Sequence, residues 1–175
     1  MAEAKEAKAL SGLRIVFERS RQRGRTTLAG GAGGLLALAL AQTRSQGAFV
    51  YLWDRRRSRL DLTVWRGLDP TPIERFEVEV GGAKAVWCLE RSGTVEVPDK
   101  AWHDWRFEDF PEFLEHRFEA VTSVPLLHRG GVVGIANLCR RKRLAGVKSE
   151  GDYLRSLGAP LGALVAAGWE TADAA

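Results

Sequence analysis

The sequence predicts an α+β domain with a central antiparallel sheet of five or six strands. N- and C-terminal helices should pack on one face, with loops and short helices over the other. Short β-rich runs joined by tight turns are typical of antiparallel hairpins. Helical periodicity appears at both ends of the chain, and 175 residues suit one domain with a single core.

Two helices are expected before the first strand. Residues 2–22 begin with many Ala, Glu and Lys residues and carry Leu10, Leu13 and Phe17 at helical spacing. A second helix is expected over about 26–44. It contains four glycines, which are poor helix formers, so we expect its backbone to pack closely against a neighbour.

Strands and turns follow in the middle of the chain. The β-rich runs 48–54 and 60–67 flank an arginine-rich turn and predict a hairpin, and 75–80 alternates apolar residues with glutamates. A short helix is expected over 83–91. A short strand is expected over 94–99.

The last third of the chain predicts loops, a hairpin and a long helix. Residues 100–119 mix acids with aromatics and should form loops and short helix. Strands are expected at 121–127 and 132–139, with the second antiparallel to the first hairpin. Residues 149–169 carry four leucines at spacings of 3, 4 and 3, which indicates a helix that Pro160 should kink.

The charge distribution argues against a nucleic-acid binder. Residues 1–60 hold 12 Lys/Arg against 4 Asp/Glu, residues 61–120 hold 7 against 14, and residues 121–175 hold 7 against 4. The arginine-rich stretches 55–59 and 140–143 should lie at opposite ends of the sheet. Such an arrangement builds no single basic groove, so no nucleic-acid partner is expected.

A membrane or secreted protein is not expected either. Residues 21–41 combine a basic lead with an apolar run, but about twenty residues, some of them acidic, precede it. The apolar run is also shorter than the ~20 residues that a membrane span needs. Two cysteines are too few for a disulfide framework. We therefore expect a cytoplasmic location and no membrane partner.

Several motifs occur in an order that resembles the GAF domain family, small-molecule sensor modules common in bacterial signalling. GAFVYLWD at 47–54 is followed by Gly-Leu at 67–68, and GGAKAVWCLERSGTVEVPD at 81–99 is similar to the family's central stretch. DWRF follows at 104–107. The Ser, Pro-Leu, Gly and Leu pattern over 123–138 completes the resemblance.

The resemblance covers roughly 26–168 and implies three parts. These are an N-terminal leader or dimerisation helix at 1–24, a GAF-like domain at 25–170 and a C-terminal tail at 171–175. Family members often pair through the leader helix, and both terminal helices carry apolar stripes. A homodimer through these helices is therefore expected.

The function that the resemblance implies is a non-enzymatic sensory domain that binds a small organic ligand in signal transduction, without a cofactor. Three alternatives remain open. One is a structural dimerisation module whose pocket is filled by aromatic side chains. Another is a small redox or sulfoxide-reducing enzyme, although that branch uses three cysteines and this chain has two. The third is a nucleic-acid binder.

An aromatic group after residue 100 marks the candidate ligand site. In the family this region covers the pocket, where flat side chains can stack on a planar ligand or fill the cavity. Surrounding acids, Glu112 among them, favour a neutral or cationic ligand over a nucleotide. The candidate ligand-binding residues are Tyr51, Trp53, Trp87, Trp102, Trp105, Phe107, Phe110, Phe113, Ser123 and Asn137.

Cysteine and histidine offer no clear chemistry. Cys88 and Cys139 are interpreted as packing residues, with a reactive thiol as the alternative at each. His103, His116 and His128 have no helical i,i+4 partner, so no metal site is expected. No GxSxG or HExxH motif is present, and no catalytic residue is assigned.

Overall fold

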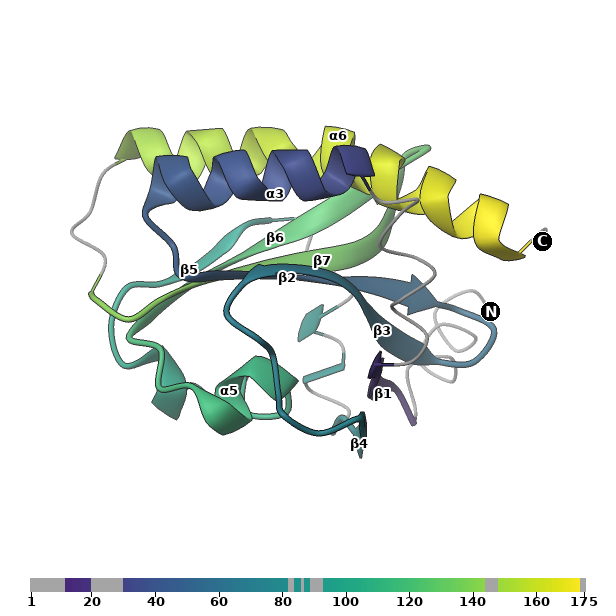
Figure 1. Cartoon of the computed structure of the whole chain (residues 1–175), viewed down its shortest axis with the longest axis horizontal. Coiled ribbons are helices and arrows are strands. Elements are labelled where there is room, and N and C mark those ends of the chain that lie inside the picture. Colours follow the sequence, from purple (N-terminus) through teal and green to yellow (C-terminus); the bar gives the residue numbers. More distant parts are fainter. Residues whose placement is uncertain are drawn as a thin grey trace.

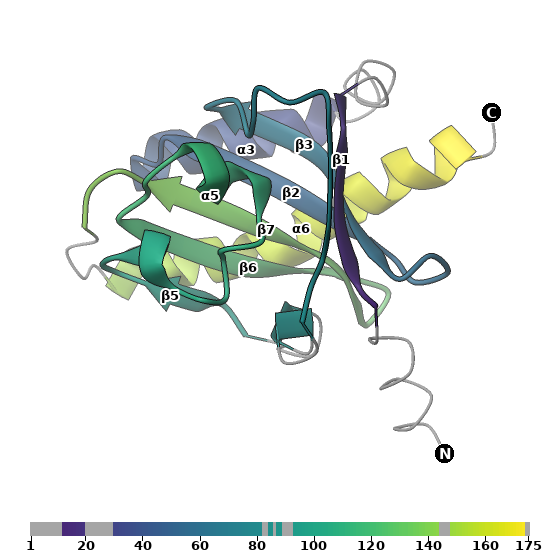
Figure 2. The same cartoon turned by 90° about the horizontal axis from the view of Figure 1, so that it is seen from below.

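The computed structural model describes residues 12–19, 30–81, 84–85, 87–88, 93–143 and 148–173. One sheet forms the centre, with strands in the order β4-β1-β3-β2-β7-β6-β5 and helices on both faces (Figures 1 and 2). The strands are β1 (Arg14–Glu18), β2 (Gly47–Asp54), β3 (Arg59–Gly67), β4 (Arg75–Glu79), β5 (Val95–Val97), β6 (Ala120–His128) and β7 (Gly131–Arg140). The helices include α3 (Gly30–Thr43), η1 (Ala101–His103), α5 (Pro111–Glu115) and α6 (Lys148–Asp173).

The α+β class is confirmed, but the expected sheet is wrong in two details. It has seven strands where five or six were expected. It is also mixed, because β1 pairs with β3 in parallel while the other pairs are antiparallel. Helices α3 and α6 lie side by side over one face, and η1 and α5 lie over the other (Figures 1 and 2).

The helix expected over 2–22 is wrong where the structure describes it. Arg14–Glu18 forms β1, an inner strand between β4 and β3. Leu13, Ile15 and Phe17 alternate along this segment and are buried in the core beneath the sheet. The apolar residues therefore repeat every second position, as in a strand. The domain boundary expected between residues 24 and 25 lies outside the described part of the chain.

The two hairpins of the centre agree with the expected strands. Strand β2 pairs with β3 and with β7, both antiparallel, and β7 pairs with β6. The register of β2 on β7 places Gly47 opposite Cys139 and Leu52 opposite Gly134. The arginine turn after β2 and the basic residues after β7 therefore lie at opposite ends of the sheet, as expected.

Close backbone approach explains several glycines in the helices. A Cβ at Gly158 of α6 would meet the Pro125 carbonyl oxygen of β6 at 2.5 Å, and one at Gly162 would meet backbone atoms of Leu127. In α3, Gly31 faces Leu164 of α6 and Gly33 faces the Arg66 side chain. Side chains at Gly158 and Gly162 would push α6 away from the sheet, whereas at Gly31 and Gly33 the flexible neighbouring side chain could move instead.

Helix α6 continues through Pro160. The short helix expected over 83–91 is helical at Lys84–Ala85 and Trp87–Cys88, and its other positions lie outside the described residues. Among the helices that the structure describes, none is long and apolar enough to cross a membrane.

Candidate functional site

The candidate site lies on the sheet face opposite α3 and α6, where neighbouring strands align polar side chains in an apolar surface. The register places Ser123 of β6 opposite Asn137 of β7, and Asn137 opposite Phe49 of β2. In the next row Tyr51 of β2 lies opposite Ile135 of β7. Successive residues of a strand point to opposite faces, so residues two apart share this face.

A buried carboxyl group lies above these residues. Glu112 in the first turn of α5 has an exposed fraction of 0%. The Tyr51 hydroxyl donates a hydrogen bond to Glu112 Oε2, and Asn137 Nδ2 donates to Glu112 Oε1 at 3.0 Å. Burial raises the pKa of Glu112 to about 7, against the opposing effect of the two hydrogen bonds.

The tyrosine responds to the same environment. Burial, and then the charge of Glu112, raise the pKa of Tyr51 well above its ordinary value. Tyr51 is therefore a neutral hydrogen-bond donor across the physiological range. Its partner is a carboxyl group that changes charge near neutral pH.

Residues 104–118, here called the roof, include α5 and lie over this face of the sheet (Figure 2). Phe110 packs edge-on against Tyr51, with ring centroids 4.9 Å apart, and Phe107 packs edge-on against Trp87 at 5.1 Å. Both phenylalanines are fully buried. The roof and the sheet thus form one apolar core with Glu112 inside it.

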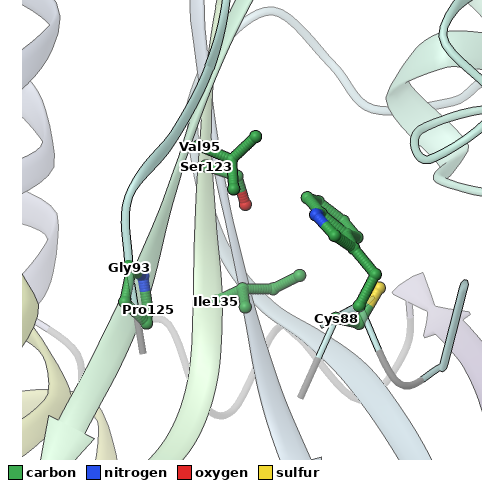
Figure 3. Close-up of a pocket in the computed structure, with 7 residues that line it drawn as sticks. Cys88, Gly93, Val95, Ser123, Pro125 and Ile135 are labelled. Carbon is green, nitrogen blue, oxygen red and sulfur yellow. The ribbon is translucent and has the colours of Figure 1, made fainter. Parts of the chain in front are cut away.

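The space left beside this core is small. One cavity leaves about 10 Å³ for the centre of a water-sized molecule. Figure 3 shows Ser123 and Ile135 projecting from the strands toward the segment that carries Cys88. The lining residues are Trp87, Cys88, Gly93, Val95, Ser123, Pro125 and Ile135.

Two buried polar atoms at this site have no hydrogen-bond partner within the described ranges. They are the indole Nε1 of Trp87, which lines the cavity, and Oδ1 of Asn137. Asn137 and Ser123 are directly paired across β6 and β7. The free donor therefore lies on the segment before β5, and the free acceptor lies on β7, beside a residue that lines the cavity.

Several of the predicted ligand-binding residues lie elsewhere. Trp105 is 50% exposed. Trp53, near the end of β2, is half-buried, with the Arg55 guanidinium 4.3 Å from its ring centroid. The Arg117 guanidinium covers the Trp102 ring at 3.7 Å. The structure therefore does not bring these three tryptophans into the group around Glu112.

The other predicted residues do gather around the roof. Phe113 is half-buried and stacks on Phe107 with ring centroids 5.5 Å apart. Ser123 of β6 lines the cavity, so the predicted residues that lie together extend from the roof to β6. The residues that the structure brings together are Tyr51, Trp87, Phe107, Phe110, Phe113, Ser123 and Asn137.

Both thiols are buried and free. Burial raises the pKa of Cys88 to about 12 and the pKa of Cys139 well above its ordinary value. Since the thiolate is the nucleophilic form, neither side chain has the environment of a reactive cysteine. His116 Nε2 lies 2.7 Å from the carbonyl oxygen of Asp69, and the described residues contain no group of three or more potential metal ligands.

The cations near the roof have partners of their own. The guanidinium of Arg106 forms a bidentate pair with Asp104, at 2.9 and 2.6 Å. Lys84 contacts Glu108 and lies 3.0 Å from Asp109, so it ties the segment before β5 to the roof. These cations are engaged with other carboxylates, and no Lys or Arg pairs with Glu112 among the described residues.

Glu112 is the residue that sequence reasoning missed. It was counted with the neighbouring acids of an acidic segment and treated as part of a surface charge. The signals for its burial are weak: Pro111 before it begins α5, and Phe110 and Phe113 flank it. Nothing in the local pattern separates it from the exposed Glu115.

Comparison with known proteins identifies the fold. No family model matches the sequence, and no curated protein matches it significantly. Among solved structures, the GAF domain of a phosphoenolpyruvate-protein phosphotransferase from Coxiella burnetii has a TM-score of 0.67 and 16% identity, covering 87% of this chain and 94% of that chain. The corresponding GAF domain from Acinetobacter has a TM-score of 0.62 and 20% identity, covering 79% and 82%.

An enzyme shares the same architecture. The free methionine-R-sulfoxide reductase of Neisseria meningitidis, in complex with its substrate, has a TM-score of 0.59 and 19% identity, covering 82% of this chain and 81% of that chain. At these identities the likeness concerns the fold. The resemblance noted in the sequence is thus confirmed at that level: the chain has the fold of a GAF domain.

Proposed function

We propose that this protein is a non-enzymatic sensory domain that binds a small organic ligand between the sheet and the roof. The observation that carries the proposal is the pair of buried atoms without partners, Trp87 Nε1 and Asn137 Oδ1. Buried polar atoms in a finished core are nearly always hydrogen-bonded. A ligand that accepts from the indole and donates to the amide would complete this core.

The ligand should be neutral or cationic. Arg106 is engaged with Asp104 and Arg117 covers Trp102, so neither guanidinium is available to an anion on the sheet. An anion would also approach Glu112, whose carboxyl group has only neutral donors around it. The surrounding rings favour a molecule with an apolar or aromatic part.

Binding requires the roof to move. A cavity of about 10 Å³ has room for about one water molecule and for no organic molecule. An entering ligand must therefore displace side chains around the cavity, such as Trp87 and the Phe107 ring of the roof that packs against it. Such displacement supplies a signal, because a bound and an empty domain would differ in the position of the roof.

The absence of enzymatic activity is supported by the thiols. Both cysteines are buried, and burial raises the pKa of each. A sulfoxide-reducing reaction needs a thiolate that reaches the substrate. We therefore place this chain with sensory domains and not with the reductases of the same fold.

We expect a ligand to quench or shift the fluorescence of Trp87 and to raise the melting temperature. The experiment is native mass spectrometry of freshly purified protein, followed by a metabolite screen read by thermal shift and by indole fluorescence. The matched variants are Trp87→Phe, which should lose the fluorescence response, and Trp105→Phe, which should keep it because Trp105 is exposed. A cyclic nucleotide that binds at micromolar concentration would contradict the charge argument, and an empty screen would favour the second candidate below.

A structural dimerisation module is the second candidate, favoured by an uncharged helix surface. Helix α3 has no charged residue over Gly30–Thr43 and exposes Leu38 at 58%. Leu164 of α6 is 40% exposed and packs against Gly31. An apolar surface shared by two adjacent helices is suited to a second copy of the chain.

Leu38→Glu should convert a dimer into a monomer without changing the fold. The charge would lie in the centre of the apolar surface, where burial against a partner is costly. Sedimentation velocity at tens of micromolar measures the state, and circular dichroism verifies the fold. Leu114→Glu is the control, because Leu114 is similarly exposed but lies on α5, across the sheet. A wild-type protein that sediments only as a monomer would rule this candidate out.

A further inference from the structure

Glu112 is a titratable group, and neither proposed function uses its change of charge. Its carboxyl group is fully buried and links three elements: its own α5, β2 through Tyr51, and β7 through Asn137. Both donors are neutral. Within the described ranges no Lys or Arg pairs with it, and an ionised carboxylate buried without a cation is costly.

We infer that Glu112 is a proton-binding site that controls the roof: it holds the roof closed when protonated and opens it when ionised. The inference goes beyond ligand binding, since it makes the proton itself an input to the domain. It rests on the proposed function only for its consequence, which is that pH would control access to the ligand site. Roof opening can be measured with no ligand present.

Burial without a cation favours the neutral acid in the closed roof, although the two hydrogen bonds from Tyr51 and Asn137 favour the carboxylate. The oxygen Oδ1 of Asn137 has no partner, while Nδ2 donates to Glu112. If the amide is turned over, its oxygen accepts the proton of neutral Glu112, and its nitrogen takes the position that has no partner. The neutral and ionised forms therefore make the same number of hydrogen bonds to Asn137, and the cost of a buried charge without a cation decides between them. Burial also raises the pKa of Glu112 to about 7, which brings this change into the physiological range.

The other titratable groups around Glu112 do not replace it as the switch. Tyr51 on β2, Cys139 on β7 and Cys88 before β5 are all buried with raised pKa values, so they are neutral at pH 5 to 8. Arg140 on β7 donates a hydrogen bond to the Thr43 carbonyl oxygen at 3.0 Å.

On the roof itself the charged groups are outside or paired. Glu108 and Asp109 contact Lys84, and Glu115 is exposed. His116 follows α5 and lies against the Asp69 carbonyl oxygen. Because histidine ordinarily changes charge near neutral pH, His116 needs its own control.

The roof is the part most able to respond. Helix α5 has only five residues, and the roof is held by short turns such as the Phe110 amide to the Phe107 carbonyl oxygen. Strands β6 and β7 are paired along their whole length. Short elements with few main-chain bonds open at lower free energy than central strands. Ionisation of Glu112 would therefore lift the roof before it disturbs the sheet.

The experiment is amide hydrogen exchange of the ligand-free protein between pH 5 and pH 8, corrected for the intrinsic pH dependence of exchange. We expect the protection of residues 104–118 to be lower at pH 8 than at pH 5 by about tenfold or more. If opening of the roof releases one proton, its equilibrium constant rises about tenfold for each pH unit. Protection of β6 and β7 should remain. Glu112→Gln keeps the size of the side chain and one acceptor oxygen without the charge, so its roof should stay protected at pH 8.

Two further variants separate the causes. Glu115→Gln removes an exposed acid of the same helix, and His116→Gln removes the neighbouring imidazole; both should keep the pH response. Three results would overturn the inference. The roof of Glu112→Gln could lose protection at pH 8 as the wild type does, or the roof of His116→Gln could stay protected at pH 8. Strands β6 and β7 could also lose protection together with the roof. A pH response with no ligand in the screen would leave the proton site standing and remove the ligand-binding proposal. Ligand binding without a pH response would do the reverse.

Discussion

Phe17→Ala is expected to lower the free energy of unfolding by about 3–5 kcal/mol, the usual cost of removing a buried phenylalanine ring. Phe17 has an exposed fraction of 1% and packs edge-on against Trp65 of β3, with ring centroids 5.6 Å apart. It belongs to β1, an inner strand that has neighbours on both sides. The cavity left by alanine would therefore lie in the core beneath the sheet, and the paired strands could not move to fill it.

Urea denaturation measures this loss, and Arg14→Ala in the same strand is the matched control. Arg14 is exposed and forms a surface ion pair with Glu77 at 2.6 Å. Such pairs contribute about 0–1 kcal/mol. If Phe17→Ala cost no more than Arg14→Ala, β1 would not be an integral strand of the sheet. The same placement predicts that a chain shortened to begin after residue 19 loses its cooperative transition.

Most of the fold could be predicted because most segments carry a sequence pattern that indicates only one kind of secondary structure. The hairpin of β2 and β3 and the hairpin of β6 and β7 both consist of β-rich runs joined by short turns. The antiparallel placement of β7 on β2 was also expected. The register then fixed where the arginine clusters lie, at opposite ends of the sheet.

Strand β1 could not be recognised because its segment carries two periods at once. Leu10, Leu13 and Phe17 match a helix, whereas Leu13, Ile15 and Phe17 match a strand. Five residues are too few to decide between them. Pairing with the rest of the sheet decides between them, because β1 pairs with β3 along one edge and with β4 along the other.

The aromatic part of the site could be predicted as a group, but not residue by residue. Clustering in the sequence indicated a cover for the sheet, and Phe107 and Phe110 are indeed buried there. Trp105, between them and Trp102, turns outward. Turn geometry decides these directions, because the segment lacks a regular period. For the same reason, the burial of Glu112 among exposed acids could not be read from the sequence.

Glu112→Gln is expected to change how stability depends on pH. Burial raises the pKa of Glu112 to about 7 from an ordinary value of 4.5. The folded protein therefore holds a proton that the unfolded chain releases above about pH 4.5, so stability is full below that pH, falls as pH rises and levels off above about pH 7. The glutamine variant carries no such proton. Its free energy of unfolding should exceed that of the wild type by little at pH 4.5 and by up to about 3 kcal/mol at pH 8.

The size of that difference tests whether the roof opens. If the roof stayed closed over an ionised Glu112, the wild type would bear the full loss of about 3 kcal/mol, and the curve would level off near pH 7. If the roof opens, the carboxylate reaches water and the loss stops at the free energy of opening. The plateau is then smaller and begins at lower pH, at the point where hydrogen exchange of residues 104–118 rises. Urea denaturation of the two proteins from pH 4.5 to pH 8 measures the height of the plateau and the pH at which it begins.

A plateau near 3 kcal/mol without roof exchange would mean that the folded domain tolerates a buried charge, and that Glu112 is not the switch. A flat difference across the whole range would mean that Glu112 is ionised at no cost, which its burial among phenylalanine rings argues against.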